Sequence, residues 1–144
     1  MKAVKIYNNI FLPFPPASGN HRLMIQSRGG KPRFFQNQAY RKYREDILLS
    51  TPRGSSFEPL PDDRKWMKDI LLLISIQAPD RRIRDCDGIL KVVLDVLKEL
   101  WEVDDSRFLP RCQEYAVNTE NPHVFIYGEQ TLFEGRPVSP NKGN

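Results

Sequence analysis

The stretch ILLLISIQAPDRRIRDCDGILKVVLDVLKEL, residues 70–100, decides the fold of this chain. Its opening run from Ile70 to Ile76 is apolar enough to predict a buried strand, which Pro79 ends. From Asp87 to Leu100 the apolar residues recur at helical spacing, and the polar residues fill an arc of roughly 120°. A helix with so wide an apolar face is expected to pack against a sheet or another subunit.

The sequence on either side predicts shorter elements. KAVKIYNNIF, residues 2–11, is rich in β-branched and aromatic residues and predicts a strand that ends at the proline cluster beginning with Pro13. The remaining expectations, in chain order, are a loop over residues 17–33, a helix over 38–49 capped by Asn37, an exposed and mobile connection over 51–65, strands over 113–119 and 123–129, and a disordered tail over 133–144.

Composition and charge fit a single domain with a polyanionic partner. The chain has 144 residues, 40% of them hydrophobic and 28% charged, which is enough for one core. The net charge of +4 is unevenly spread, because residues 1–60 carry ten Lys and Arg against three Asp and Glu, whereas residues 61–144 carry twelve against fifteen. This asymmetry is expected when one region binds phosphate and another holds a cationic metal.

Several protein classes are not expected from this sequence. No apolar run approaches the roughly 20 residues of a membrane helix, and MKAVKIYNNIF lacks the apolar stretch and cleavage site of a secretory signal. The expected location is therefore the cytoplasm, with no membrane partner. Cys86 and Cys112 lack the spacing of a zinc site, and we expect both to be small, reduced side chains.

Acidic residues and one lysine are concentrated between positions 84 and 105. Asp85 and Asp87 stand at the predicted strand–turn–helix junction, where alternate residues of an extended stretch point the same way. Asp104 and Asp105 follow the helix and could supply an opposing wall if the chain doubles back. Mg²⁺ prefers oxygen ligands, and metal-assisted phosphodiester hydrolysis needs carboxylates from separate segments. Lys91, one turn after Asp87, is placed to stabilise charge on a phosphate.

Simpler roles account for each of these residues taken alone. An aspartate before a helix is first of all an N-cap, which contributes about 1 kcal/mol. An Asp–Lys pair four residues apart is commonly a surface ion pair, and Asp104-Asp105-Ser106 can be a simple turn. Capping needs one aspartate rather than two and does not explain the second acidic pair, so the pattern alone leaves both interpretations open.

The ordered spacing of these residues is more specific than any one of them. Residues 78–106 resemble the core of the RusA family of crossover junction endodeoxyribonucleases, which typically show a proline-rich N-terminal turn (here PFPPASGNHR), a motif of the form RDxDNxxKxxxDxL, an aromatic and DDxQ. The resemblance spans most of residues 8–127. Gly88 stands where the family usually has asparagine, and Arg107 where it usually has glutamine. The matching residues are Arg84, Asp85, Asp87, Lys91, Asp95, Leu97, Trp101, Asp104 and Asp105.

The resemblance implies a fold, a reaction and a set of functional residues. The fold would be a single small α/β (α+β) domain over residues 1–132, with a mixed sheet packed by helices, assembled as a homodimer. The reaction would be Mg²⁺-dependent resolution of four-way DNA by symmetric paired nicking, with Mn²⁺ able to substitute and no organic cofactor. Asp85, Asp87 and Asp105 would ligate the metal, with Asp104 as a further candidate ligand, and Lys91 would be the essential basic residue.

Cationic residues around the acidic window are expected to contact DNA. Phe34 or Phe35 is a candidate wedge between unstacked bases, although such residues are more often part of a core. The expected phosphate contacts are Arg22, Arg28, Lys31 and Arg33 in the predicted loop, Arg81, Arg82 and Arg84 before the acidic window, and Arg107 after it.

Two other functions fit parts of the sequence. A protein of the same fold could bind branched DNA without cutting it, although the intact acidic residues and Lys91 argue for cleavage. A sugar or nucleotidyl transferase could hold a nucleotide-bound metal on Asp85-Cys86-Asp87, but no glycine-rich phosphate loop supports this. Cleavage is therefore the leading hypothesis, and it is compatible with a bacterial or phage protein that associates with the nucleoid.

Overall fold

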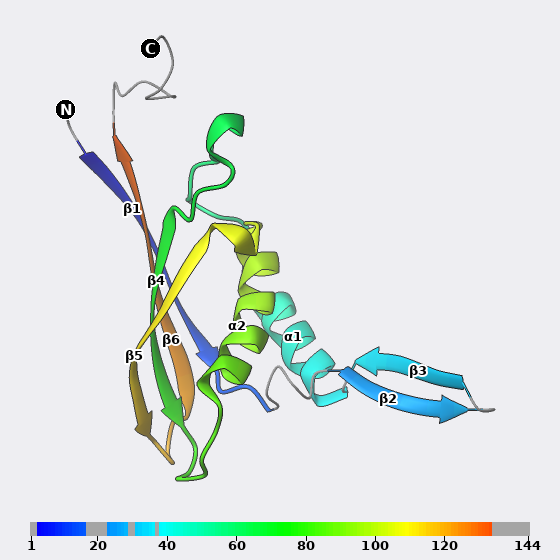
Figure 1. The fold of residues 1–144 in the computed structure, drawn as a ribbon. Helices are drawn as coiled ribbons and strands as arrows, with labels where there is room; N and C mark the ends of the chain where they lie inside the picture. Colours follow the sequence, from blue (N-terminus) through cyan, green and yellow to red (C-terminus); the bar gives the residue numbers. More distant parts are fainter. Residues whose placement is uncertain (1–2, 17–22, 29–30, 37, 134–144) are drawn as a thin grey trace.

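The computed structural model describes residues 3–16, 23–28, 31–36 and 38–133 (Figure 1). No helix in this described part of the chain is both long and apolar enough to cross a membrane. The elements are, in chain order, β1 (Ala3–Pro13), β2 (Leu23–Arg28), β3 (Lys31–Gln36), α1 (Gln38–Ser50), η2 (Asp62–Arg64), β4 (Ile70–Ala78), α2 (Cys86–Trp101), η3 (Asp105–Arg107), β5 (Phe108–Val117) and β6 (His123–Phe133). The strand and the helix predicted over residues 70–100 are therefore confirmed as β4 and α2.

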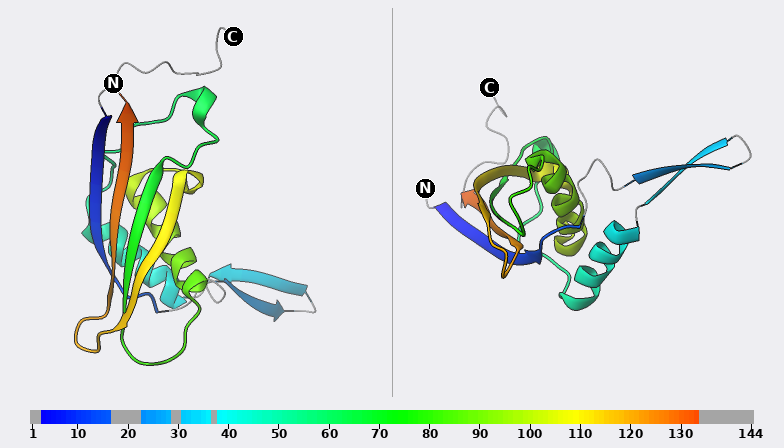
Figure 2. Two further views of the ribbon diagram at one scale, coloured as in Figure 1. Left: turned by 60° about the vertical axis from the view of Figure 1, so that its left-hand side comes forward. Right: turned by 90° about the horizontal axis from the view of Figure 1, so that it is seen from below.

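Four of the strands form one mixed sheet in the order β1-β6-β4-β5. β6 pairs antiparallel with both β1 and β4, whereas β5 pairs parallel with β4. Parallel neighbours need a crossover connection, and α2 provides it by running back over one face of the sheet between β4 and β5. Both α1 and α2 lie on that face (Figure 2). The expected single small α+β domain, with a mixed sheet packed by helices, is confirmed.

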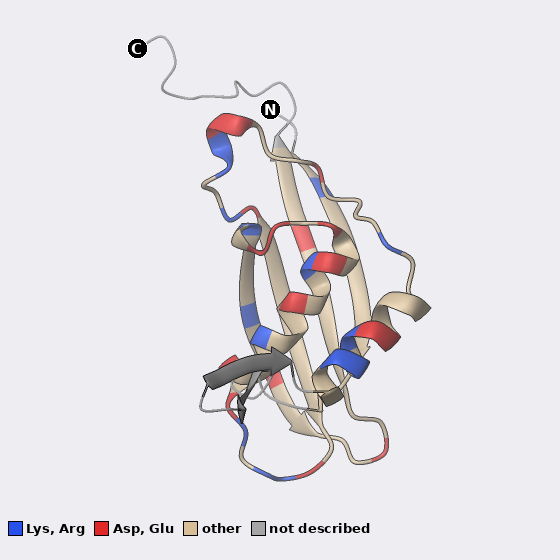
Figure 3. Ribbon diagram, turned by 90° about the vertical axis from the view of Figure 1, so that its right-hand side faces the viewer, with Lys and Arg blue, Asp and Glu red and all other residues tan. Residues whose placement is uncertain are grey.

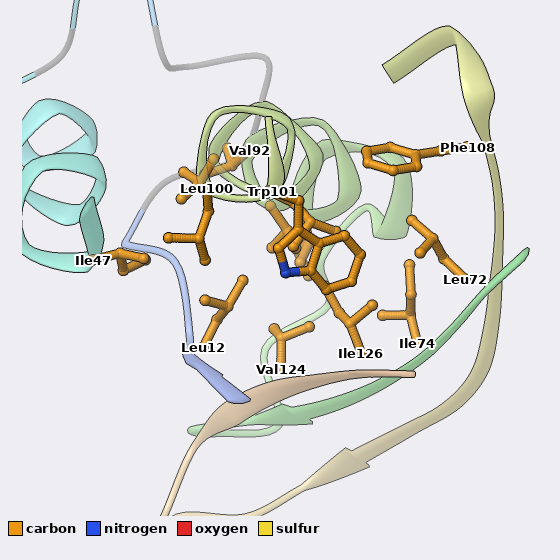
Figure 4. Packing of buried hydrophobic residues seen from close by; sticks show 14 of the residues in the cluster. Leu12, Ile47, Leu72, Ile74, Val92, Leu100, Trp101, Phe108, Val124 and Ile126 are labelled. Carbon is orange, nitrogen blue, oxygen red and sulfur yellow. The ribbon is translucent and has the colours of Figure 1, made fainter. Parts of the chain in front are cut away.

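The core lies between α2 and the sheet, which confirms that the apolar face of the helix packs against strands. Burial alternates along β4 from Ile70 to Ala78, because successive side chains of a strand point to opposite faces. The apolar face of α2 is buried from Ile89 to Trp101. Figure 4 shows the packing of Leu72, Ile74, Val124 and Ile126 of the sheet against Val92, Leu100 and Trp101 of the helix.

The helix predicted over residues 38–49 is confirmed as α1, and two polar contacts hold it in place. The guanidinium of Arg44 donates to both carboxylate oxygens of Glu99 on α2, with Nη2 at 2.8 and 2.6 Å from them. The Tyr43 hydroxyl donates to the carbonyl of Pro13 at 2.6 Å, where β1 ends. α1 is thereby attached both to α2 and to the end of the first strand. Asn37, the expected cap, lies outside the described residues.

The prediction of a loop over residues 17–33 is wrong for much of that range. β2 and β3 pair antiparallel from Leu23 opposite Gln36 to Arg28 opposite Lys31, forming a separate two-stranded sheet. Figure 1 shows this hairpin standing apart from the four-stranded sheet. In the sequence, Gly29-Gly30 separates the two paired segments, and a Gly-Gly pair between two strand-like runs is a typical sequence signal of a hairpin.

The connection over residues 51–65 is irregular apart from η2, and most of it is exposed, as expected. The prediction is wrong for Phe57, which is buried with its ring edge-on to Trp101 at a centroid distance of 5.3 Å. The N–H of Gly54 also donates to the carbonyl of Leu100 at 2.9 Å. The connection is thus anchored on the C-terminal end of α2, and its mobility stays a prediction.

The two C-terminal strands are longer than predicted. β5 begins at Phe108 rather than at Gln113, because Pro110 does not interrupt it. β5 is an edge strand that pairs only with β4 in the sheet, and an edge strand tolerates the missing N–H of a proline. β6 runs to Phe133, one residue beyond the expected domain end, and the tail over residues 134–144 lies outside the described residues.

Candidate active site

Asp85 and Asp87 both lie at the N-terminal end of α2. Asp85 is the N-cap, and its carboxylate accepts a hydrogen bond from the N–H of Asp87 at 3.1 Å. Asp87 lies in the first turn, where a negative side chain interacts favourably with the helix dipole. Both side chains are exposed. The capping role is therefore confirmed for Asp85, and it leaves further carboxylate oxygens directed at solvent at this end of the helix.

The loop that leads into Asp85 is held by its own charges. Nη1 of Arg84 lies 2.8 Å from Oδ1 of Asp80, which also accepts the N–H of Arg82 at 2.9 Å. The hydrogen bond from Arg84, followed by that from the Arg82 backbone, lowers the pKa of the Asp80 carboxyl. The Arg84 guanidinium stacks over the ring of Phe14, 5.1 Å from its centroid. Arg84 thus joins the proline-rich turn to the acidic motif, while Arg81 and Arg82 remain exposed.

Asp104 and Asp105 lie beyond the opposite end of α2. Asp104 is the N-cap of η3, and its carboxylate accepts the N–H of Ser106 at 2.9 Å. This hydrogen bond lowers the pKa of Asp104. Both aspartates are exposed, and a hollow of about 320 Å³ lies beside Asp104, between the 59–65 segment and Arg107. The turn interpretation of this pair is confirmed, and it leaves both carboxylates at the surface.

A buried polar cluster fixes η3 to the sheet. Nε and Nη2 of Arg107 donate to the two carboxylate oxygens of Asp69 at 2.9 and 2.7 Å, and the side chains are only 13% and 8% exposed. Nη2 also donates to the carbonyl of Glu58 at 2.6 Å. Gln130, fully buried, donates to Asp69 and bonds to both backbone groups of Glu58. The structure therefore places the Arg107 guanidinium inside the protein, and its expected DNA contact stays a prediction.

The two acidic pairs do not converge within one chain. α2 has 16 residues, which at 1.5 Å per residue corresponds to about 24 Å between the pairs. Figure 3 shows acidic residues at both ends of this helix and cationic residues on the loop that leads into it. Among the described residues, no three His, Cys, Asp or Glu side chains group closely enough to hold a metal ion. The expected opposing wall is absent because the chain doubles back only after the full length of α2.

Lys91 lies where the sequence predicts it, one turn after Asp87 on the exposed side of α2. It therefore stands at the N-terminal end of the helix, with Asp85 and Asp87. Arg28, Lys31 and Arg33 lie on the β2–β3 hairpin, and their side chains lie outside the described residues, as does Arg22. The expected phosphate contacts of these four residues stay predictions.

Sequence reasoning missed one pair of neighbours in this region. Sγ of Cys86, the first residue of α2, lies 3.7 Å from Sγ of Cys112 on β5, and both cysteines are free. Burial, followed by the neighbouring Cys112, raises the pKa of the Cys86 thiol to about 11. The two positions are 26 residues apart in the chain, and only the packing of α2 beside β5 brings them together.

The candidate site combines exposed carboxylates, a lysine on α2 and an arginine-bearing loop on a small mixed-sheet domain, and such side chains suit an enzyme that acts on phosphodiester bonds. The family model of endodeoxyribonuclease RusA matches residues 13–127, which is most of the chain. The chain therefore belongs to the RusA family and is an endodeoxyribonuclease. Members of this family act on branched DNA and resolve Holliday junctions, and nucleases of this kind generally use a divalent metal. A comparison with curated proteins gives no match.

Two substitutions of Asp85 are expected to separate capping from catalysis. Asparagine caps a helix about as well as aspartate but carries no charge, so Asp85→Asn should keep the free energy of unfolding within about 0.5 kcal/mol. Asp85→Ala loses the cap and should cost about 1 kcal/mol. Urea titration measures both values, and junction cleavage should be lost in both variants. If Asp85→Asn cleaved at the wild-type rate, Asp85 would have only the capping role and no catalytic one.

Proposed function

We propose that this protein resolves four-way DNA junctions by Mg²⁺-dependent paired nicking, as a homodimer in which each active site is shared between two subunits. The observation that carries the proposal is the placement of Asp85 and Asp87 at one end of α2 and of Asp104 and Asp105 at the other. A two-fold axis that sets two copies of α2 antiparallel brings the first pair of one copy next to the second pair of the other.

The exposed side of α2 supports such an arrangement. Asp87, Lys91, Asp95 and Lys98 follow one another along the helix with alternating charge. In an antiparallel pair centred at Val96, the level at which Asp87 of one copy lies beside Asp105 of the other, Lys98 of one copy faces the region of Asp95 of the other, and Lys91 faces the region of Glu102. Opposite charges thus meet across the two-fold axis, which favours this register over a parallel one.

The side chains present suit a hard divalent cation. Asp85 and Asp87 of one copy and Asp105 of the other offer oxygen ligands, which Mg²⁺ prefers and Mn²⁺ also accepts. A divalent metal held by these carboxylates would supply an activated water and would stabilise the charge that develops on the phosphate. Lys91 contributes a positive charge beside the scissile phosphate. Arg81 and Arg82, both exposed on the preceding loop, bind neighbouring phosphates and position the strand.

Paired nicking follows from the symmetry of this dimer. A four-way junction must be cut in two strands, and a two-fold dimer presents two equivalent sites to them.

A protein that cuts recombining DNA must reach the chromosome, so we also propose that it acts in the cytoplasm, at the nucleoid. A non-cleaving protein that only binds branched DNA is the second candidate, and the experiment below distinguishes it.

Subunit complementation is the sharpest test of the shared site. Asp87→Asn and Asp105→Asn proteins are each expected to be inactive on a synthetic four-way junction with Mg²⁺. After equal mixing and subunit exchange, half of the dimers combine one of each chain, and each of these has one intact site. The mixture should therefore nick at about a quarter of the wild-type rate.

A mixture of Asp85→Asn with Asp87→Asn is the matched control. Both changes fall at the same end of α2, so neither site of the mixed dimer is intact and no cleavage is expected. If the first mixture also stays inactive while the wild-type protein cleaves, the site is not shared in this way. Tight junction binding by the wild-type protein without nicking in Mg²⁺ or Mn²⁺ would favour the binding protein instead.

A further inference from the structure

Cys86 lies within the candidate active site. It stands between the two candidate metal ligands Asp85 and Asp87, at the first residue of α2, and it packs partly against the core. Its sulfur lies 3.7 Å from that of Cys112, which is exposed on the edge strand β5. Cys112 also lies beside an irregularity in the β4–β5 pairing, where the register shifts after Ile74.

The two sulfurs lie in van der Waals contact. A disulfide bond is about 2.05 Å long, so the sulfurs must approach by less than 2 Å to form one. Cys112 is exposed and open to a reagent from solvent, whereas Cys86 is partly buried. This arrangement of an accessible cysteine with a second one beside it is the one that a reversible disulfide requires.

We propose that Cys86 and Cys112 form a reversible disulfide that restrains the N-terminal turn of α2 and thereby slows DNA cleavage. The oxidant is a small-molecule disulfide such as oxidised glutathione. The thiolate of Cys112 attacks it, releases one small thiol and forms a mixed disulfide. The thiolate of Cys86 then attacks Sγ of Cys112 and releases the second small thiol. One small disulfide is reduced to two thiols, and the two cysteines lose two electrons and two protons.

The link acts on the active site through the backbone. It ties the residue between Asp85 and Asp87 to β5, so neither carboxylate can adjust freely to a metal ion or a phosphate. Misplacement of a catalytic group by about 1 Å can cost about a hundredfold in rate, and we expect at least about a tenfold slower cleavage in the oxidised protein. This effect on cleavage rests on the proposed function, whereas formation of the bond does not.

The test starts with the full-length protein, reduced or treated with oxidised glutathione. Mass spectrometry of the treated wild-type protein should show the loss of two hydrogen atoms and a peptide linking Cys86 to Cys112. Closing this loop should raise the midpoint of thermal unfolding by about 10 °C. Junction cleavage should fall at least about tenfold and return on treatment with dithiothreitol. Cys112→Ser is the control, and it should cleave like the reduced wild-type protein with and without oxidant.

Each outcome decides one part of the proposal. Absence of the Cys86–Cys112 peptide after oxidation would overturn the site itself. Formation of the bond with unchanged cleavage would overturn its effect on activity. A reduced wild-type protein that fails to cleave would contradict the proposed function, and the mass and unfolding measurements would still decide whether the disulfide forms.

Discussion

Replacing Asp87 with asparagine should reduce cleavage of a four-way junction at least about a hundredfold while the protein still binds the junction. The carboxylate is exposed in the first turn of α2, so its loss disturbs no core contact. What it removes is a negative ligand oxygen, without which Mg²⁺ is held and positioned less well against the phosphate. Cleavage rates measured at saturating protein, together with gel-shift affinities, separate the chemical step from binding.

Asp46→Asn provides the matched control for this substitution. Asp46 is an exposed aspartate on the other helix, paired with Lys42 at 3.1 Å, and it lies outside the candidate site. The control variant should cleave at the wild-type rate. Equal cleavage by Asp87→Asn and Asp46→Asn would show that Asp87 holds no metal. It would then contradict a catalytic role for the acidic N-terminal end of α2.

Breaking the buried Asp69–Arg107 pair should have the largest effect on stability. In Arg107→Gln, the Asp69 carboxylate stays buried without its counter-ion, and the Glu58 carbonyl loses a donor. Removing one partner of a buried ion pair typically costs 3–5 kcal/mol, and we expect a loss of about 3 kcal/mol in the free energy of unfolding. Urea unfolding followed by tryptophan fluorescence measures it, since Trp101 lies in the core near Phe108.

A second substitution should rescue much of this loss. Asp69→Asn removes the buried charge, so the double variant Asp69→Asn/Arg107→Gln should recover at least about half of the stability lost in Arg107→Gln. Lys42→Gln is the control, because its ion pair with Asp46 is exposed and should contribute less than about 0.5 kcal/mol. A small effect of Arg107→Gln, equal to that of the control, would show that the pair is not buried in solution.

The main elements could be predicted because their signals are local. The apolar run from Ile70 and the helical spacing from Asp87 onward each lie within a single segment, and both elements form where expected. The β2–β3 hairpin is not predicted because glycine and proline residues within 17–33 favour a loop, and the pairing of the two strands is not visible in either strand alone. The spacing of the acidic residues and Lys91 singles them out as candidates, and in the structure they are exposed near the ends of α2, while their catalytic roles stay predictions.

The remaining features depend on contacts between distant segments. Asp69 and Arg107 are 38 residues apart, and Gln130 of β6 donates a hydrogen bond to Asp69, so no window of sequence contains the cluster. The sequence shows the charge of Arg107 but not its partner Asp69, and the expected DNA contact of Arg107 stays a prediction. Asp85 and Asp105 are separated because the continuous helix α2 lies between them. Whether Asp105 of a second copy approaches Asp85 depends on how two copies of the protein associate, which no single sequence shows.

The length of α2 would set a scale for the substrate of the proposed dimer. If two copies of α2 pair antiparallel as proposed, one active site lies at each end of the pair, and we expect the two nicks to lie about 24 Å apart. That span corresponds to about seven nucleotide steps of 3.4 Å along one strand. A junction whose two target phosphates lie at another separation must bend or open before both can be cut, and the energy needed to deform it then contributes to the choice of substrate.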